Sequence, residues 1–169
     1  MVDYDEFLDL VDQQDRVVGR ERRSVVYAQR LSNFRVINAF IKNSNGELWI
    51  PRRTANKRMF PLCLDVSVGG HVESGETYYQ AFERETEEEI NLKLRKGSYR
   101  LLGHLRPYVH GVSAFMNVYE IKSEETPDYN KDDFVESFWM KPEVILTQIA
   151  AGEKAKGDLP KLVKIFYLS

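Results

Sequence analysis

The amino-acid sequence predicts an α/β domain in which helices cover a mixed β-sheet. Three observations indicate this class: paired strand-like segments open the chain, an amphipathic helix follows them, and further strand-like segments precede two C-terminal helices. Strands and helices in this order form layered domains around a shared core. The chain has 169 residues, 43% of them hydrophobic, which is enough to bury one core. We therefore expect a single domain over residues 1–169.

Two hairpins are expected in the first half of the chain, because β-branched and aromatic residues flank turn sequences there. The polar run 12–15 joins the strands of the first hairpin, and Asn-Ser-Asn-Gly at 43–46 joins those of the second. Pro51 limits pairing on one side, so a loop is expected after it. The expected elements are strands at 7–11 and 17–18, a short helix at 20–30, strands at 35–41 and 48–50, a loop at 52–58, and a strand at 65–68 that runs into Gly69 and Gly70.

A helix is expected from Thr77 to about Ile90. Thr77, followed three residues later by Gln80, is a plausible capping box, in which each side chain bonds the backbone N–H of the other residue. Asn91 is a suitable end, because asparagine tolerates the left-handed conformation. Beyond it we expect strands at 99–105, 113–121 and 137–140, a helix at 143–150 with Pro142 near its first turn, and a helix at 159–167 capped by Asp158.

The composition excludes several classes of protein. With 24 basic and 26 acidic residues the formal charge is −2, which argues against a generally basic nucleic-acid-binding protein. Cys63 is the single cysteine, so neither an internal disulfide nor a cysteine metal cluster can form. The chain starts with an acidic segment rather than a signal peptide, and no run approaches the ~20 apolar residues of a membrane span. We therefore expect a cytoplasmic protein without a membrane segment.

The predicted helix and the loop before it carry seven glutamates: Glu73, Glu76, Glu83, Glu85, Glu87, Glu88 and Glu89. At about 100° per residue, Glu85, Glu88 and Glu89 share one face of the helix, beside an apolar stripe that can dock on the sheet. Three like charges within one turn repel each other unless a cation compensates them. Carboxylates without histidine or thiolate partners suit Mg²⁺ or Mn²⁺, and Mg²⁺ commonly shares its shell with phosphates. The pattern favours metal-dependent phosphate chemistry, and a solvated acidic helix face is the alternative.

The spacing of these residues is specific. Five residues separate Gly70 from Glu76, seven more precede Arg84-Glu85, and two more precede Glu88-Glu89. This pattern resembles the Nudix box, which here spans 70–92. The resemblance implies a Nudix-type α/β/α sandwich with a mixed β-sheet, and a hydrolase that cleaves a diphosphate with Mg²⁺ or Mn²⁺. Two positions depart from the motif: Thr86 stands for an aliphatic residue and Asn91 for a glycine.

The resemblance extends from about Phe7 to the final helices and is closest to the Nudix branch that looks like isopentenyl-diphosphate isomerase. That isomerase has a catalytic cysteine before its glycine-histidine pair, whereas Gly69 precedes Gly70-His71 here. The isomerase also uses acidic residues on a later strand, and residues 108–118 contain no carboxylate. We therefore expect a hydrolase. The isomerase and a non-catalytic Nudix ligand-binding module are the alternatives, and cleavage of a larger nucleic acid is disfavoured by the acidic composition.

The resemblance also implies roles for the box residues. The expected metal ligands are Glu85, Glu88, Glu89 and the carbonyl of Gly70 or Gly69. Arg84 is expected to orient Glu85 or Glu76 through an ion pair, because its planar fork suits a carboxylate. The expected catalytic residues are Glu85, Glu89 and Arg84 of the box, together with Glu136 from outside it.

Residues outside the box complete the expected site. Glu136, with Glu120 as a second candidate, is expected to take the proton of the attacking water, because a metal-bound carboxylate is a poor general base. Arg53 and Lys57, together with Arg52, are expected to bind the diphosphate, and a solvated basic loop is the alternative.

The expected substrate is a small molecule with a diphosphate linkage, above all a nucleoside diphosphate or a derivative of one. Phosphate or a phosphomonoester would be the leaving product. The aromatic residues indicate no base preference, because such rings are more often core residues in a small α/β domain. Monomer and homodimer are both compatible with the sequence.

Overall fold

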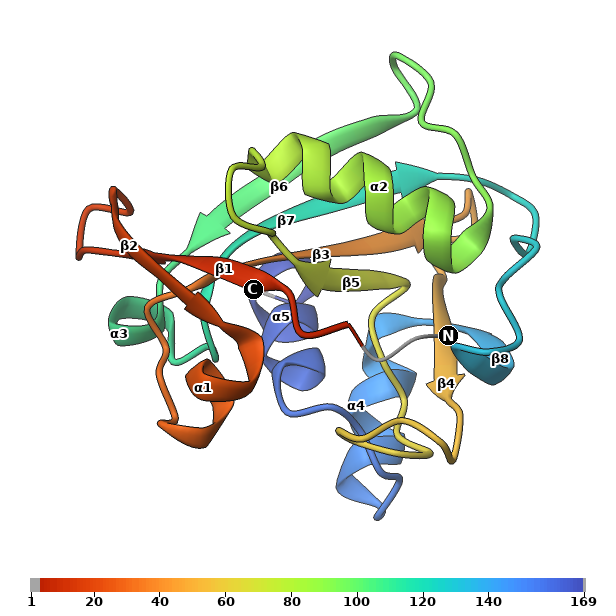
Figure 1. Ribbon diagram of the computed structural model, residues 1–169. Helices are drawn as coiled ribbons and strands as arrows, with labels where there is room; N and C mark the ends of the chain where they lie inside the picture. The colour runs from red at the N-terminus through yellow and green to blue at the C-terminus, as the bar shows by residue number, and fades with distance from the viewer. Residues whose placement is uncertain (1–3, 169) are drawn as a thin grey trace.

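A six-stranded mixed sheet forms the centre of the structure, a computed structural model that describes residues 4–168. The strands run in the order β6-β7-β3-β4-β8, and β5 pairs with β3 (Figure 1). β3 and β7 are parallel, and the other pairs are antiparallel. The strands are β3 (Arg35–Lys42), β4 (Leu48–Arg53), β5 (Val68–His71), β6 (Tyr99–Leu105), β7 (Phe115–Lys122) and β8 (Phe134–Met140). The mixed α/β class predicted from the sequence is confirmed.

Helices cover both faces of this sheet (Figure 1). Within residues 4–168, no helix is long and apolar enough to cross a membrane. The helices are α1 (Arg23–Ala28), α2 (Tyr78–Ile90), the single turn α3 (Pro107–His110), α4 (Pro142–Ala150) and α5 (Asp158–Tyr167).

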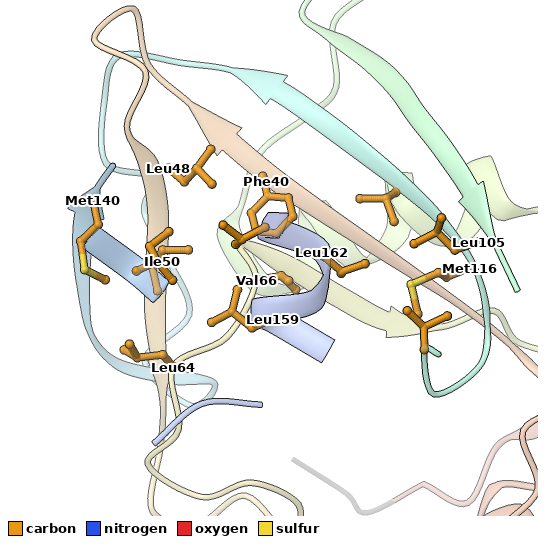
Figure 2. Packing of buried hydrophobic residues seen from close by; sticks show 14 residues of the cluster. Phe40, Leu48, Ile50, Leu64, Val66, Leu105, Met116, Met140, Leu159 and Leu162 are labelled. Carbon is orange, nitrogen blue, oxygen red and sulfur yellow. The ribbon is translucent and has the colours of Figure 1, made fainter. Parts of the chain in front are cut away.

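Two apolar clusters hold the layers together. On one face, α2 packs on the sheet, and the Phe82 ring stacks on Tyr119 with the ring centroids 4.0 Å apart. On the other face, α4 and α5 cover a second cluster in which Phe40 meets Leu159 and Leu162 (Figure 2). Removal of these side chains from water is the main force that joins helices to sheet. The sheet therefore has an α2 face and an α4/α5 face.

The N-terminal hairpin is longer than predicted and the helix after it is shorter. β1 (Phe7–Val11) and β2 (Val17–Arg22) form a separate two-stranded sheet in which Phe7 pairs with Arg22. The guanidinium groups of Arg20 and Arg22 lie 4.6 Å and 4.7 Å from the centre of the Phe7 ring. These contacts keep Arg20 to Arg22 extended, so α1 begins at Arg23 rather than at residue 20.

Both ends of α2 match the prediction. The Gln80 N–H donates to Thr77 Oγ1 at 3.1 Å, and the Thr77 N–H donates to Gln80 Oε1 at 2.9 Å, which completes the capping box. Asn91 adopts the left-handed conformation at the C-terminal end, with a φ of 52°. The interactions that delimit α2 join residues close together in the chain, so both ends of the helix can be predicted from the sequence.

β4 continues through Pro51 to Arg53, where the sequence predicts a loop. The Pro51 carbonyl accepts a hydrogen bond from the Asp65 N–H at 2.9 Å, on the side of the strand away from β8. The proline nitrogen points to that same side, so the ladder with β8 loses no hydrogen bond. β8 accordingly starts at Phe134, which pairs with Arg53, rather than at residue 137.

β5 begins at Val68 rather than at residue 65, and it contains the two glycines as paired strand residues. Gly69 pairs with Asn38 and Gly70 pairs with Ile37 of β3. The glycines therefore lie in the sheet, under α2, and not after the end of the strand as the predicted bounds 65–68 imply.

Asp158 does not cap α5 as predicted. Its carboxylate instead accepts hydrogen bonds from the backbone N–H and the hydroxyl of Ser113. The N-cap residue is Gly157, which makes no side-chain cap. Asp158 therefore joins the segment just before β7 to the first turn of α5 and does not cap the helix.

Candidate active site

Gly70 lies directly against the carboxylate of Glu85. A Cβ atom at position 70 would lie 2.2 Å from Glu85 Cδ, far inside contact distance. Only glycine lets the strand backbone approach the carboxylate this closely. The neighbouring Gly69 faces the other way, since a Cβ atom there would lie 3.1 Å from Asn38 Oδ1 and 3.2 Å from Val66 Cγ2. A thiol at position 69 would therefore point away from Glu85.

Glu85 and Glu89 are two acidic side chains on the face of α2 toward β5. The Glu85 side chain is 14% exposed, and the buried Glu89 accepts a hydrogen bond from the Gly69 N–H at 2.9 Å. Burial raises the pKa of Glu85 to about 7, against the opposing effect of Arg84. Burial, and then the charge of Glu85, raises the pKa of Glu89 well above its usual value. The pair therefore favours a bound proton or cation at neutral pH.

Arg84 joins the loop before α2 to Glu85. Its Nε and Nη2 atoms each donate to one carboxylate oxygen of Glu76 at 2.8 Å, as a bidentate fork. Nη1 donates to Glu85 Oε1 at 2.8 Å, and Nη2 donates to the His71 carbonyl at 3.0 Å. Burial opposes ionisation of Glu76, but the hydrogen bonds from Arg84, the hydrogen bond from the Glu73 N–H and the charge of Arg84 together lower the pKa of Glu76. Arg84 thus contacts both partners that the sequence predicts for it.

Glu88 is the most exposed of the three predicted acidic ligands. Its side chain is 59% exposed, and Oε2 lies 3.4 Å from Arg84 Nη1. Within residues 4–168, no three acidic, histidine or cysteine side chains already converge as a metal-binding group. The structure therefore shows Glu85 and Glu89 together and Glu88 beside Arg84.

Arg53 and Lys57, the basic residues predicted to bind the diphosphate, each form an ion pair with an aspartate. Arg53 Nη1 lies 2.9 Å from Asp65 Oδ2, and Lys57 Nζ lies 2.6 Å from Asp133 Oδ1. Both aspartates are buried. After burial and Glu85, the charges of Asp65 and Asp133 also raise the pKa of Glu89, which indicates that both lie near it. Arg53 and Lys57 are therefore each held by a buried carboxylate whose charge acts on Glu89.

Arg52 and Glu136 lie elsewhere, contrary to the prediction. Arg52 Nε lies 2.6 Å from Glu136 Oε2, and Nη1 lies 2.6 Å from Glu153 Oε1. Strand alternation puts Arg52 on the same sheet face as Ile50, which packs with α4 and α5, whereas Trp49 packs with α2. The proposed catalytic role of Glu136 and the substrate-binding role of Arg52 are therefore withdrawn.

Glu120 is also on the α4/α5 face. Its carboxylate accepts a hydrogen bond from the Tyr167 hydroxyl of α5 at 2.7 Å and from Arg100 Nε at 3.2 Å. The sheet separates it from Glu85, so it does not serve as a base for a reaction at the box.

Sequence reasoning missed four residues around this site: Asp65, Asp133, Glu6 and Tyr27. Asp65 had a signal, because a lone charged residue in the run Leu-Asp-Val-Ser-Val at 64–68 indicates a buried and paired carboxylate. Asp133 lies among other polar residues, and nothing local marks it. Glu6 and Tyr27 meet the site only through the folding of the N-terminal segment onto His71.

A glycine strand that packs against a glutamate-bearing helix on a mixed sheet defines the class of this protein. A family model described as the NUDIX domain matches residues 32–161, and the chain belongs to this family. It is 59% identical over 162 residues to the uncharacterized Nudix hydrolase all7351 of Nostoc sp., with 96% of each chain covered. It is 50% identical to the protein in the crystal structure of DR0079 from Deinococcus radiodurans, with a TM-score of 0.92 and coverage of 96% of this chain and 99% of that one. The resemblance to Nudix hydrolases is confirmed.

A weaker similarity connects the chain to the isomerase branch. The chain is 26% identical over 147 residues to an isopentenyl-diphosphate Delta-isomerase of Salmonella heidelberg, with 80% of this chain and 81% of the relative covered. The names of the more similar relatives are those of Nudix hydrolases. The protein is therefore an enzyme of the Nudix hydrolase family.

Proposed function

We propose that this protein uses Mg²⁺ or Mn²⁺ to hydrolyse a diphosphate linkage in a small substrate, above all a nucleoside diphosphate or a derivative of one. The observation that carries this proposal is the pair Glu85 and Glu89, buried against the backbone of β5 with raised pKa values. Two cations, Arg53 and Lys57, pair with the buried aspartates whose charges act on Glu89. The site thus combines acidic groups for a metal with basic groups for phosphate.

The residues present fit a hard divalent cation. Two buried carboxylates that repel each other are unfavourable unless a cation or proton compensates them. Their donor atoms are all oxygens, as Mg²⁺ and Mn²⁺ prefer, and the contact at Gly70 leaves no room for a competing side chain. Glu85, Glu88, Glu89 and the Gly70 carbonyl are the proposed ligands. A bound ion would neutralise phosphate oxygens and lower the pKa of a bound water.

The other residues have positioning roles in this proposal. Arg84 holds Glu85 by the ion pair described above, and Glu76 fixes Arg84 in turn. Lys57 and Arg53 contact the diphosphate, with their side chains held in place by Asp133 and Asp65. Because Glu136 lies on the α4/α5 face, we propose that Glu85 or Glu89 accepts the proton of the attacking water while its own carboxylate is not bound to the metal.

A substrate panel tests this function. The protein is incubated with nucleoside di- and triphosphates, nucleotide sugars, dinucleoside polyphosphates and prenyl diphosphates, with Mg²⁺ or Mn²⁺, and the products are identified. We expect metal-dependent hydrolysis that falls at least about 100-fold in Glu89→Gln. The exposed Glu87, two residues from both Glu85 and Glu89 but on the opposite face of the helix, provides the control variant Glu87→Gln, which should retain activity.

Two results would contradict the proposal. Absence of metal-dependent turnover with every compound would favour a ligand-binding module. Incorporation of solvent deuterium into isopentenyl diphosphate would indicate an isomerase, although position 69 offers no thiol and faces Asn38 rather than Glu85.

A further inference from the structure

The N-terminal segment reaches the active site through His71, the residue after Gly70. Glu6, just before β1, lies 2.9 Å from His71 Nδ1 through Oε1. The Tyr27 hydroxyl of α1 lies 2.6 Å from His71 Nε2. Both ring nitrogens of His71 are therefore bound by residues from the N-terminal segment.

The Glu6 partner fixes the direction of one hydrogen bond. The ionised Glu6 carboxylate only accepts, so Nδ1–H donates to it. Nε2 and the Tyr27 hydroxyl share the second hydrogen bond, in which the hydroxyl donates to a neutral ring and accepts from a protonated one. The imidazole also packs edge-on against the Tyr27 ring with the centroids 5.6 Å apart, and against Phe34 at 6.0 Å. These four contacts leave the His71 ring a single orientation.

His71 in turn contacts the box. Its carbonyl accepts from Arg84 Nη2 at 3.0 Å, and Arg84 Nη1 donates to Glu85 at 2.8 Å. The charge of Glu6 also acts on Glu85. Burial is the main cause of the raised pKa of Glu85, and the negative charge of Glu6 raises it further. The pKa of Glu6 is lowered by His71 and Arg84 against the effect of burial. Arg84 therefore lowers the pKa of both Glu6 and Glu85, and the charge of Glu6 raises that of Glu85.

Backbone contacts seat the segment on the loop before α2. The Ser74 N–H donates to the Phe7 carbonyl at 2.8 Å, and Leu8 forms an isolated antiparallel bridge with Glu73. The largely buried Asp9 accepts from the Ser74 hydroxyl at 2.7 Å and from the Gly75 N–H at 3.1 Å. The loop that leads into the metal-binding helix is thus held from outside the sheet.

We propose that Glu6 and Tyr27 are positioning residues of the active site, which hold His71 and through it Arg84 and Glu85. Both residues lie outside the segment 32–161 that the family model matches, so the N-terminal segment completes a site whose motif lies elsewhere. This inference rests on the proposed function for its kinetic consequence. Its consequence for metal affinity does not depend on turnover.

The variant Tyr27→Phe tests the proposal, because it keeps the ring contacts with His71 and Phe34 and removes only the hydroxyl. Loss of one hydrogen bond predicts about a fivefold fall in kcat and in Mn²⁺ affinity, with the KM for the diphosphate unchanged. Mn²⁺ affinity is measured by electron paramagnetic resonance of the free ion. A matched control is Tyr78→Phe, which removes a tyrosine hydroxyl bonded to Asp15 at 2.8 Å and should lower the melting temperature without changing kcat.

A second pair of variants separates positioning from folding. Glu6→Ala removes the acceptor for Nδ1–H and should lower kcat and Mn²⁺ affinity about tenfold, since hydrogen bonds to charged groups are the stronger ones. Glu6→Gln restores an acceptor oxygen and should recover most of both. The proposal is overturned if Tyr27→Phe and Glu6→Ala lower only the melting temperature and leave kcat and Mn²⁺ affinity at wild-type values. If the native protein hydrolyses no diphosphate, the proposed function fails. The Mn²⁺ affinities of Tyr27→Phe and Glu6→Ala, compared with that of the wild type, still decide whether Glu6 and Tyr27 position the site.

Discussion

The backbone N–H of Gly69 donates to Oε1 of Glu89 at 2.9 Å, which joins the central sheet to the glutamate helix at the candidate site. The next residue, Gly70, contacts Glu85, one turn earlier on that helix. Two consecutive glycines thus contact two carboxylates one helical turn apart. Gly69 donates its backbone N–H to Glu89, and Gly70 leaves room for Glu85 because it has no side chain. The position of the acidic pair is set by the strand backbone as much as by α2.

Gly70→Ala tests this dependence on the strand. The added methyl group would overlap Glu85, which has to move, and a displacement of about 1 Å in a catalytic group costs about 100-fold in rate. We expect that loss in kcat while the circular dichroism spectrum stays native. Gly19→Ala is the control, since a Cβ atom there meets nothing within 4 Å. Unchanged kcat in Gly70→Ala would show that the contact has no role in catalysis.

The stability of the metal-free protein should depend on Glu85. The folded carboxyl keeps its proton up to a pKa of about 7, whereas the unfolded group loses it near 4.5. The folded state then binds more protons between these values, so the free energy of unfolding falls as the pH rises from about 4.5 to 7. Urea unfolding of wild type and Glu85→Gln across this range should show a steeper fall for wild type. Parallel curves would refute the raised pKa.

Lys57 is expected to act in substrate binding. Removing it alone would leave Asp133 buried without a partner, so the double variant Lys57→Gln/Asp133→Asn is the cleaner test. Loss of one charge-assisted contact predicts about a tenfold rise in the KM for the diphosphate with kcat nearly unchanged. Initial rates over a range of substrate concentrations give both constants. A KM equal to that of wild type would remove Lys57 from the proposed site.

Glu136→Gln is expected to leave kcat within about twofold of wild type, because the ion pair with Arg52 is partly exposed and lies on the α4/α5 face. A pH–rate profile of this variant should overlay that of the native enzyme. A large fall in kcat with loss of the basic limb would restore Glu136 as the general base and contradict the face assignment.

Local interactions explain what could be predicted from the sequence. Thr77, Gln80 and Asn91 delimit α2 through contacts within a few residues, so its bounds follow from the sequence. The side of the sheet on which Arg52 lies depends on the register of β4 with β8, which no short motif records. Basic residues that are neighbours in the chain therefore received the same predicted role but lie on different faces.

Contacts between distant segments could not be predicted at all. Lys57 meets Asp133, and Glu6 meets His71, only after the sheet has formed and the N-terminal hairpin has packed on the loop before α2. The box motif specifies the carboxylates, whereas the residues that hold them come from other parts of the chain. The spacing of charged residues thus predicts which chemistry the site carries out better than it predicts which residues surround the site.

The most direct test of the central claim is a Mn²⁺ titration of wild type, the double variant Glu85→Gln/Glu89→Gln and the control Glu87→Gln, followed by electron paramagnetic resonance. If the two buried carboxylates hold the metal, wild type and Glu87→Gln bind Mn²⁺ with the same affinity, and the double variant loses at least about 100-fold. Equal Mn²⁺ affinity in all three proteins would contradict the account.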